Sequence, residues 1–454
     1  MIIATAGAAV PHWLGMVSPA RAAAFGILLR VERQQAYAAE LLHSHRLGEL
    51  FTADRALCTE LVMGVLRWQS RLDLGISAVS SQPLQKLDLE VLIALRMAAY
   101  QIGFLERVPA RAAVNESVEL VKRAHKRSAA PFANAVLRKL AGQPALLQRR
   151  PALAPKTAPE LAEEYAHPLW LVERWVATYG SDAAGKICQC GQTVPETMLR
   201  LRDPAAEAEL RQAGIELAPG RLLAAARRIK GVQGLLPVQG RVAVQDEASQ
   251  LVALLVGRGG RILDCCAAPG GKTAILAERN PQATIVAVDL HPHRARLLAR
   301  LLPTGSKVHV ITADATRLPL VGEFDRVLVD VPCSGTGTLA HNPEIKWRLQ
   351  LADLDDLHVR QVAILKAALE RVSRGGRAIY ASCSLEREEN AAVVEEALAG
   401  RSDFRVLECR EELQGLRNEL AWEDLESLLQ GPYLRTIPGV HPCDGFFAAL
   451  MERR

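Results

Sequence analysis

The sequence predicts a multi-domain protein with an N-terminal all-α bundle, a small α+β module and a C-terminal α/β domain of Rossmann-like type. Two observations lead to this prediction. Apolar residues recur at three- and four-residue spacing from Arg21 to about Leu140, which is typical of helices. From Arg241 onward short apolar strands alternate with helical segments, which indicates a doubly wound, mainly parallel sheet. A chain of 454 residues has room for roughly two to four domains.

The composition excludes several classes of protein. With 49% apolar and 23% charged residues the chain is neither disordered nor collagen-like. It has no run of about 18 uncharged apolar residues, so we expect no membrane span. Nine cysteines, an odd number at mixed spacing, favour a reducing compartment and therefore a cytoplasmic location. Residues 1–17 are predicted to form an N-terminal extension rather than a secretory signal, because the stretch lacks a basic start.

The predicted helical bundle covers residues 18–145 and carries most of the positive charge. The first 150 residues hold 19 basic and 11 acidic side chains, a net charge of +8, whereas the whole chain has +5. Within the basic clusters Arg123, Arg127 and Arg138 are candidate contacts to RNA or DNA phosphates. A solvated helix face explains each cluster alone just as well. A GC-rich genome is the favoured explanation for the overall excess of arginine.

A proline-rich linker and a small module are predicted between the two larger domains. Five prolines fall between residues 143 and 168, and we assign residues 146–168 to the linker. An amphipathic segment over 169–179, a strand over 198–202 and a helix over 204–213 predict an α+β module over 169–240. The last domain then covers residues 241–454.

The predicted parallel strands all end in residues that can carry chemistry. These strands span residues 261–264, 284–289, 308–311, 326–330 and 377–381. Ligands of such sheets bind beyond the carboxyl ends of the strands. There the chain places Asp264, Asp289, Asp314 and Asp330, a Gly-Gly turn, and two thiols, Cys333 and Cys383. We therefore expect one ligand site at this edge.

The loop after the first predicted strand was compared with three kinds of nucleotide site. A P-loop requires glycine where this chain has Cys266, although Gly271-Lys272-Thr273 fits its end and Asp330 imitates a Walker B acid. The G-x-G-x-x-G spacing of dinucleotide folds is absent. A nucleoside cofactor fits better, since the glycine pair permits close approach and Asp289, 19 residues after Gly270, can bind ribose hydroxyls.

The favoured cofactor is S-adenosylmethionine, which has ribose and adenine but no phosphate. Asp314 is then placed to face the adenine. The residues assigned to cofactor binding are Cys266, Ala267, Ala268, Pro269, Gly270, Gly271, Lys272, Asp289, Asp314 and Asp330. We predict no metal, because the eleven histidines are scattered and no C-x-x-C spacing occurs.

Three motifs carry a family resemblance. They are Asp264-x-Cys266-Ala267-Ala268-Pro269-Gly270-Gly271-Lys272-Thr273, Asp330-x-Pro332-Cys333-Ser334-Gly335-Thr336-Gly337, and Tyr380-x-Ser382-Cys383-Ser384 with Glu389-Asn390. In this order they resemble the Fmu/Sun family of bacterial 16S ribosomal RNA (cytosine-5) methyltransferases. The segments 115–120 and 132–138 resemble the NusB-like RNA-binding domain of that family. The one departure in the motifs is Ser382, where the family usually has threonine.

The resemblance implies a class I methyltransferase that uses S-adenosylmethionine. It implies methyl transfer to C5 of a specific cytosine through a covalent adduct at C6, with Cys383 as the attacking thiolate and Cys333 assisting product release. The residues alone leave the two cysteine roles open. Asp330 is placed to hold the N3/N4 edge of the base, and Lys272 either depresses the pKa of a thiol or contacts the cofactor.

The resemblance also implies the partner. We expect small-subunit ribosomal RNA, contacted by the NusB-like bundle and by Arg200 in the small module, and a monomeric protein without membrane or metal. Two alternatives remain at this point. One is a cytosine-5 methyltransferase that acts on transfer RNA, and the other is a non-catalytic RNA-binding or antitermination factor.

Overall fold

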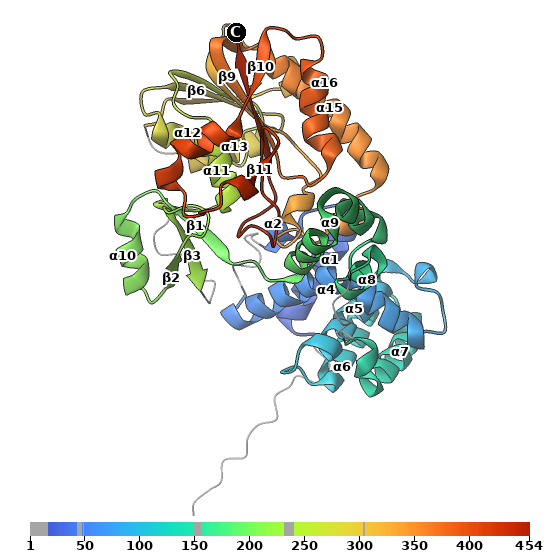
Figure 1. Cartoon of the computed structure of the whole chain (residues 1–454). Helices are drawn as coiled ribbons and strands as arrows, with labels where there is room; N and C mark the ends of the chain where they lie inside the picture. Colours follow the sequence, from blue (N-terminus) through green and yellow to red (C-terminus); the bar gives the residue numbers. More distant parts are fainter. Residues whose placement is uncertain (1–16, 43–47, 49, 149–155, 231–239, 303–304) are drawn as a thin grey trace, which may run out of the picture. The chain divides into compact units, whose positions relative to one another are not determined.

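The computed structural model describes residues 17–42, 48, 50–148, 156–230, 240–302 and 305–454. The predicted extension lies outside these residues except for Val17, as do residues 149–155 of the predicted linker. The chain divides into two compact units. One comprises Met1–Val172 with Asn342–Glu344, and the other comprises Glu173–His341 with Ile345–Arg454 (Figure 1).

The described part of the first unit is helical, which confirms the predicted all-α bundle. Its α-helices are α1 (Pro19–Gln34), α2 (Ala38–Leu42), α4 (Thr52–Val79), α5 (Leu89–Phe104), α6 (Ala110–Arg123), α7 (Ala130–Gly142) and α8 (Ala158–Glu164). Short 3₁₀ turns lie at Leu84–Lys86, Arg127–Ala129 and Pro144–Leu146. The buried faces follow the three- and four-residue spacing seen in the sequence.

Close approach of α4 and α5 holds this bundle together. A Cβ atom on Gly64 of α4 would lie 2.0 Å from the ring of Tyr100 on α5, so only glycine fits there. Arg96 of α5 donates two hydrogen bonds of 2.7 Å to the carboxylate of Asp73 on α4. Because Arg96 is buried, this bidentate pair fixes the register of the two helices.

The second unit contains a small four-stranded antiparallel sheet in the order β2-β3-β1-β4. Its elements are β1 (Thr197–Leu201), α10 (Ala205–Gln212), β2 (Glu216–Pro219), β3 (Ala226–Lys230) and β4 (Val242–Val244). The sequence indicates β1 and α10 but not the other strands, which are three to five residues long. Since β4 pairs with β1, the predicted boundary at residue 240 falls inside this sheet.

Helix α9 (Leu169–Gln192) begins in the first unit and continues into the second. It is longer than the predicted amphipathic segment over 169–179. The helix is interrupted at Gly180, whose φ of 80° lies in the left-handed region that glycine tolerates.

A nine-stranded mixed sheet forms the centre of the second unit. Its strands are β5 (Arg261–Asp264), β6 (Thr284–Asp289), β7 (Val308–Thr312), β8 (Phe324–Asp330), β9 (Val372–Ser382), β10 (Phe404–Leu407), β11 (Leu429–Gln430), β12 (Tyr433–Arg435) and β13 (Phe447–Arg453). The five predicted strands are present and lie parallel in the order β7-β6-β5-β8-β9. The four later strands are antiparallel and were not predicted.

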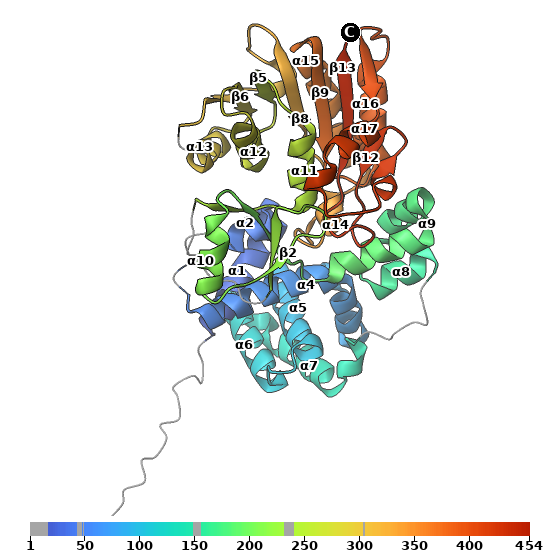
Figure 2. The same ribbon diagram turned by 60° about the vertical axis from the view of Figure 1, so that its left-hand side comes forward.

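Helices cover both faces of this sheet (Figure 2). One face packs against α11 (Glu247–Leu255), α12 (Gly271–Arg279), α13 (Pro292–Leu301) and α17 (Cys409–Gly415). The other packs against α15 (Leu351–Leu369) and α16 (Ala391–Leu398), and a short helix α14 (Ile345–Arg348) precedes them. This confirms the Rossmann-like α/β prediction.

The strand order reverses between β5 and β8, so their carboxyl ends adjoin where ligands of such sheets bind. No helix in the described part of the chain is long and apolar enough to span a membrane.

Candidate active site

The loop from β5 to α12 is shaped by its glycine pair. Gly270 has a φ of 110°, which favours glycine, and a Cβ atom there would lie 2.5 Å from the side chain of Leu298 on α13. Gly271 then begins α12. Before the pair, Ala267 and Ala268 are buried and Pro269 follows a cis peptide bond, while Cys266 is half-buried. The loop thus lies tight against α13.

Asp264 at the end of β5 is a site residue that the sequence reasoning did not assign. Its Oδ2 accepts a hydrogen bond of 2.7 Å from the Thr273 hydroxyl. Its Oδ1 is buried and has no hydrogen-bond partner among the described residues. Burial raises the pKa of Asp264 to about 7. An unsatisfied buried carboxylate oxygen beside the glycine loop is a ready acceptor for donor groups of a ligand.

Asp289 at the end of β6 ties two loops together. One carboxylate oxygen accepts from the Ala268 N–H at 3.2 Å and the other from the His291 N–H at 3.0 Å. Arg294 of α13 also donates to the Ala268 carbonyl at 3.1 Å. The structure therefore places Asp289 against the glycine loop, and its contact with ribose stays a prediction.

Asp314 does not join this cluster through any recorded hydrogen bond. It lies exposed at the start of the turn Ala315–Arg317, where its carboxylate accepts from the backbone N–H and the hydroxyl of Thr316. These hydrogen bonds lower the pKa of Asp314. Capping a turn explains its present geometry, and its contact with adenine stays a prediction.

Lys272 and Asp330 form an ion pair across the point where the strand order reverses. Lys272 Nζ lies 2.7 Å from Asp330 Oδ2 and 5.0 Å from the ring centroid of Phe446. Burial lowers the pKa of Lys272, but the charge and hydrogen bond of Asp330 outweigh it, and the pKa is raised overall. Lys272 therefore keeps its positive charge beside Asp330.

The two thiols predicted from the motifs lie together. Cys333 follows β8 and Cys383 follows β9, and their sulfur atoms are 3.0 Å apart. The pKa of Cys333 is raised well above its usual value, first by the hydrogen bond to Cys383 and next by burial. The raised pKa favours the protonated form of Cys333, and either sulfur can be the donor in this contact.

Backbone contacts fix the loop that carries Cys383. The Gly337 N–H donates to the Cys383 carbonyl at 2.9 Å, and the Gly445 N–H donates to the Gly337 carbonyl at 2.9 Å. A Cβ atom on Gly337 would lie 2.2 Å from the Gly445 oxygen. The G-T-G segment after Cys333 thus needs glycine for close backbone packing.

Side chains to which the sequence reasoning gave no role also hold this loop. Asn390 accepts from the Ser382 hydroxyl at 2.5 Å and donates to the Ser384 carbonyl at 3.0 Å, so it spans the cysteine. Tyr179 of α9 donates to the Leu385 carbonyl at 2.6 Å, and Arg435 of β12 donates to the Ser384 carbonyl at 2.8 Å. Glu389-Asn390 was visible as a motif, whereas nothing in the sequence pointed to Tyr179 or Arg435.

Comparisons with known proteins show the family of this chain. The family model described as 16S rRNA methyltransferase RsmB/F matches residues 252–452, and the NusB family model matches residues 18–142. A Bacillus subtilis protein described as a probable ribosomal RNA small subunit methyltransferase B is 34% identical, with 94% of this chain and 97% of the relative covered. The ribosomal RNA small subunit methyltransferase B of Pseudomonas syringae is 34% identical, and the match covers 80% of this chain and 83% of that protein.

The chain belongs to the RsmB/F methyltransferase family. Solved structures show the same fold at lower identity. The crystal structure of PH0851 has a TM-score of 0.75 at 23% identity and covers 97% of this chain and 100% of its own. NSun6 from Pyrococcus horikoshii, crystallised with SFG, has a TM-score of 0.52 at 19% identity and covers 63% of this chain and 98% of its own.

Membership of the RsmB/F family gives S-adenosylmethionine as the methyl donor, and the residues present fit it. The free Oδ1 of Asp264 and the glycine loop lie together at the carboxyl edge of β5. Asp289 adjoins the same loop. Across the described residues, no group of three or more histidine, cysteine or acidic side chains could hold a metal ion.

The arginines predicted to bind RNA differ in their surroundings. Arg123, Arg127 and Arg138 of the NusB domain are exposed, and the first two line a shallow hollow of about 250 Å³ with Glu119 and Lys122. Arg200 is different. It is only 7% exposed and forms an ion pair with Glu278 of α12, so our assignment of Arg200 as a surface contact to RNA is corrected to a buried structural role.

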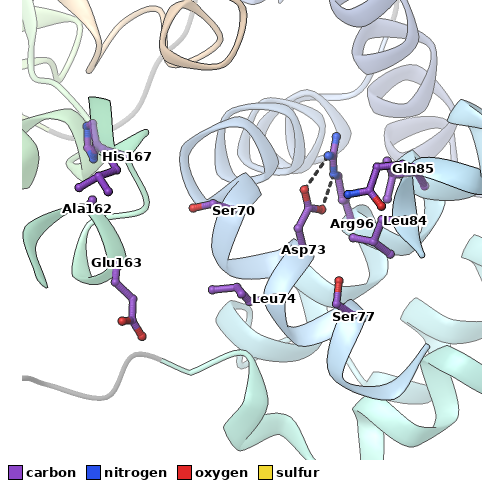
Figure 3. Close-up of a pocket in the computed structure, with 12 residues that line it drawn as sticks. Ser70, Asp73, Leu74, Ser77, Leu84, Gln85, Arg96, Ala162, Glu163 and His167 are labelled. Atoms are coloured by element: carbon purple, nitrogen blue, oxygen red, sulfur yellow. Dashed lines mark hydrogen bonds and ion pairs between the residues drawn. The ribbon is translucent and has the colours of Figure 1, made fainter. Parts of the chain in front are cut away.

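A larger cavity of about 670 Å³ in the helical unit does not belong to this site. Leucines of α4, α5 and the adjoining segments line it together with the Arg96–Asp73 pair, and Glu163 and His167 lie on its other side (Figure 3). None of the strand-end acids or thiols contributes to it.

Proposed function

We propose that this chain transfers a methyl group from S-adenosylmethionine to C5 of a specific cytosine in 16S ribosomal RNA, through a covalent adduct between Cys383 and C6. The observation that carries the proposal is the pair of thiols, 3.0 Å apart at the carboxyl edge of the sheet. The Lys272–Asp330 ion pair lies at the same edge. A methyltransferase of another class has no need for two adjacent thiols there.

The reaction explains why one thiol must be activated. Carbon C5 of cytosine is a poor nucleophile, and addition of the Cys383 thiolate to C6 gives C5 enamine character. The bound cofactor supplies an electrophilic methyl group on its sulfonium sulfur. Lys272 is the cation proposed to serve the thiols, since the pKa of Lys272 is raised chiefly by Asp330 and to a smaller extent by the charge of Cys383.

Asp330 is proposed to hold the base. A carboxylate at this place can accept a hydrogen bond from the N3/N4 edge of cytosine, which stabilises charge that develops on the ring during attack. The ion pair with Lys272 fixes the carboxylate in position before the base arrives. The target base must be unstacked for C6 to reach the thiolate.

Cys333 is proposed to act in the last step. A base from the solvent takes the proton from C5, the electrons of that C–H bond restore the C5–C6 double bond, and the sulfur of Cys383 is expelled as a thiolate. In this proposal the Cys333 S–H donates to the Cys383 sulfur, 3.0 Å away, and so stabilises the leaving thiolate. Under this proposal Cys383 attacks the base and Cys333 assists release of the product, as the family resemblance implies.

The cofactor would be held by the loop after β5 and by the acids next to it. Cys266, Ala267, Ala268, Pro269, Gly270, Gly271 and Lys272 form this loop, and Asp264, Asp289, Asp314 and Asp330 supply acceptors at neighbouring strand ends. Within the described ranges of the chain, Asp264 Oδ1 is buried without a hydrogen-bond partner, so it is left for a donor of the ligand.

A transfer assay tests the proposed function. Purified protein, tritiated S-adenosylmethionine and unmodified 16S ribosomal RNA should give label in 5-methylcytosine at a single position. Label that appears only in transfer RNA moves the substrate to the alternative considered above. Label in no RNA contradicts the proposal and favours a non-catalytic RNA-binding role.

A further inference from the structure

The two thiol loops share one buried carboxylate. Glu389 is fully buried at the end of the turn Arg387–Glu389. Its Oε1 accepts from the Ser334 N–H at 2.7 Å and from Gln361 Nε2 at 2.9 Å. Its Oε2 accepts from the Ser334 hydroxyl at 2.5 Å and from the Ser384 hydroxyl. Both serines directly follow the reactive cysteines in the sequence.

The carboxylate is itself held by the sheet and by α15. The Tyr380 hydroxyl donates to the Glu389 carbonyl at 2.5 Å, and Tyr380 belongs to β9. Gln361 of α15 donates to the Pro332 carbonyl at 2.9 Å as well as to Glu389. Glu389 is therefore a fixed point to which the loop after β8 and the loop after β9 are both tied.

We propose that Glu389 is a positioning residue that sets the separation of the Cys333 and Cys383 sulfur atoms. It does not touch the reacting atoms but acts through Ser334 and Ser384, one residue from each thiol. The catalytic consequence rests on the proposed function, whereas the separation of the thiols can be tested without it. Misplacement of reacting groups by about 1 Å can cost a factor of about 100 in rate.

Three substitutions separate length from charge. Glu389→Asp keeps the charge but shortens the side chain by one methylene, so the carboxylate no longer reaches both serines. Glu389→Gln keeps the length, and its amide nitrogen can donate to the two serine hydroxyls, which also accept. Ser384→Ala removes only the link to the loop after β9. Glu395→Gln is the matched control, because Glu395 is exposed on α16 and pairs with Arg387 at 3.4 Å.

The first readout is the rate of disulfide formation between Cys333 and Cys383 in the full chain. Diamide takes two electrons and two protons from the thiols and becomes a hydrazine, and the linked peptides are quantified by mass spectrometry. We expect wild type, Glu389→Gln and Glu395→Gln to agree within about threefold. Glu389→Asp should be slower by about tenfold or more, and Ser384→Ala should fall between. Equal rates in all five proteins would overturn the proposal.

The second readout is methyl transfer, measured with proteins whose thermal unfolding shows that they fold. The turnover number should follow the disulfide rate across the variants, while KM for RNA and for S-adenosylmethionine stays within about twofold. Glu389→Gln should restore most of the activity that Glu389→Asp loses. A wild-type protein that makes no 5-methylcytosine would refute the proposed function, but the disulfide rates would still decide the role of Glu389. If Glu389→Gln loses as much turnover as Glu389→Asp, the charge of Glu389 and not its length is what matters. That result would overturn the positioning role.

Discussion

At the scale of single residues, Cys333 and Cys383 differ through their surroundings rather than their sequence frames. Both stand after an apolar strand and before a serine, which is why the motifs indicated two reactive thiols without separating their roles. The pKa of Cys333 is raised by Cys383, by burial and by Glu389, which are set by the fold and not by the residues next to Cys333 in the sequence. The sequence therefore predicted that two thiols lie at the strand ends. It did not predict which of the two sulfur atoms is protonated.

The two cysteines should fail at different steps. Cys383→Ser should abolish turnover and leave no covalent RNA adduct, since a serine hydroxyl is a far weaker nucleophile near neutral pH. Cys333→Ala should accumulate a protein–RNA conjugate, with the methyl group already on the base, that survives denaturing gel electrophoresis. A conjugate from Cys383→Ser and none from Cys333→Ala would reverse the roles.

Asp289 should contribute strongly to cofactor affinity. Asp289→Ala removes the acceptor proposed for ribose and also frees the N–H of Ala268 in the glycine loop, so S-adenosylmethionine binding should weaken by about 1.5–3 kcal/mol. Isothermal calorimetry measures this loss, with ATP–Mg²⁺ as the control ligand that should not bind comparably. Tight ATP binding without S-adenosylmethionine binding would contradict the cofactor-binding site.

Asp264 should make stability depend on pH. Its pKa in the folded protein is about 7, above the usual value of 3.8, because burial disfavours the charged form. The folded state then holds a proton that the unfolded state releases, so the contribution of Asp264 to stability is full below about pH 4 and falls as the pH rises to about 7. Asp264→Asn has no titrating group here and does not lose this stability. Its unfolding temperature relative to wild type should therefore increase as the pH rises from about 4 to about 7. A constant difference between the two proteins from pH 4 to 7 would contradict the raised pKa.

At the scale of elements, the parallel strands were predictable and the antiparallel ones were not. The predicted parts of these five strands are mainly apolar, and each ends at an acid or a thiol or within three residues of one. β11 and β12 are two and three residues long, too short for any periodicity to show. Residues 446–451, which include most of β13, form a continuous apolar run, and such a run does not distinguish a buried strand from a helix.

The glycine turn between β5 and α12 gives a prediction at this scale. Gly270→Ala should destabilise the fold by about 2–5 kcal/mol, because it combines a left-handed φ with contact against Leu298. Gly400→Ala is the matched control, since Gly400 has a φ of 78° but open space around it, and should cost about 1–2 kcal/mol. Urea unfolding of both variants measures the difference. An equal loss of unfolding free energy in both variants would show that the Leu298 side chain moves away from the new methyl group without a loss of stability.

At the scale of the whole molecule, charge is divided between the parts of the chain. The first 150 residues carry +8, and residues 241–454 carry 26 basic against 29 acidic side chains. The sequence showed this asymmetry directly. It did not show that the small α+β module and the methyltransferase domain form one compact unit, because that depends on strand pairing such as β1 with β4.

The positive charge of the NusB domain should anchor RNA through phosphates. Charge reversal of Arg123, Arg127 and Arg138 should weaken RNA binding and flatten its dependence on salt, because fewer counterions are released. Affinity for S-adenosylmethionine should not change. Filter binding at several salt concentrations measures the slope. Unchanged RNA affinity and site choice after deletion of residues 1–145 would assign the domain another task.

The place of β13 in the sheet has a consequence for biosynthesis. This strand lies between β9 and β12, and Gly445 and Phe446 just before it contact the loop of Gly337 and the ammonium of Lys272. The ribosome adds these residues about 60 positions after Cys383. A nascent chain therefore presents both thiols before their surroundings exist, and gains a complete site only when this late strand inserts. Translation order thus separates synthesis of the nucleophile from the moment at which it can act.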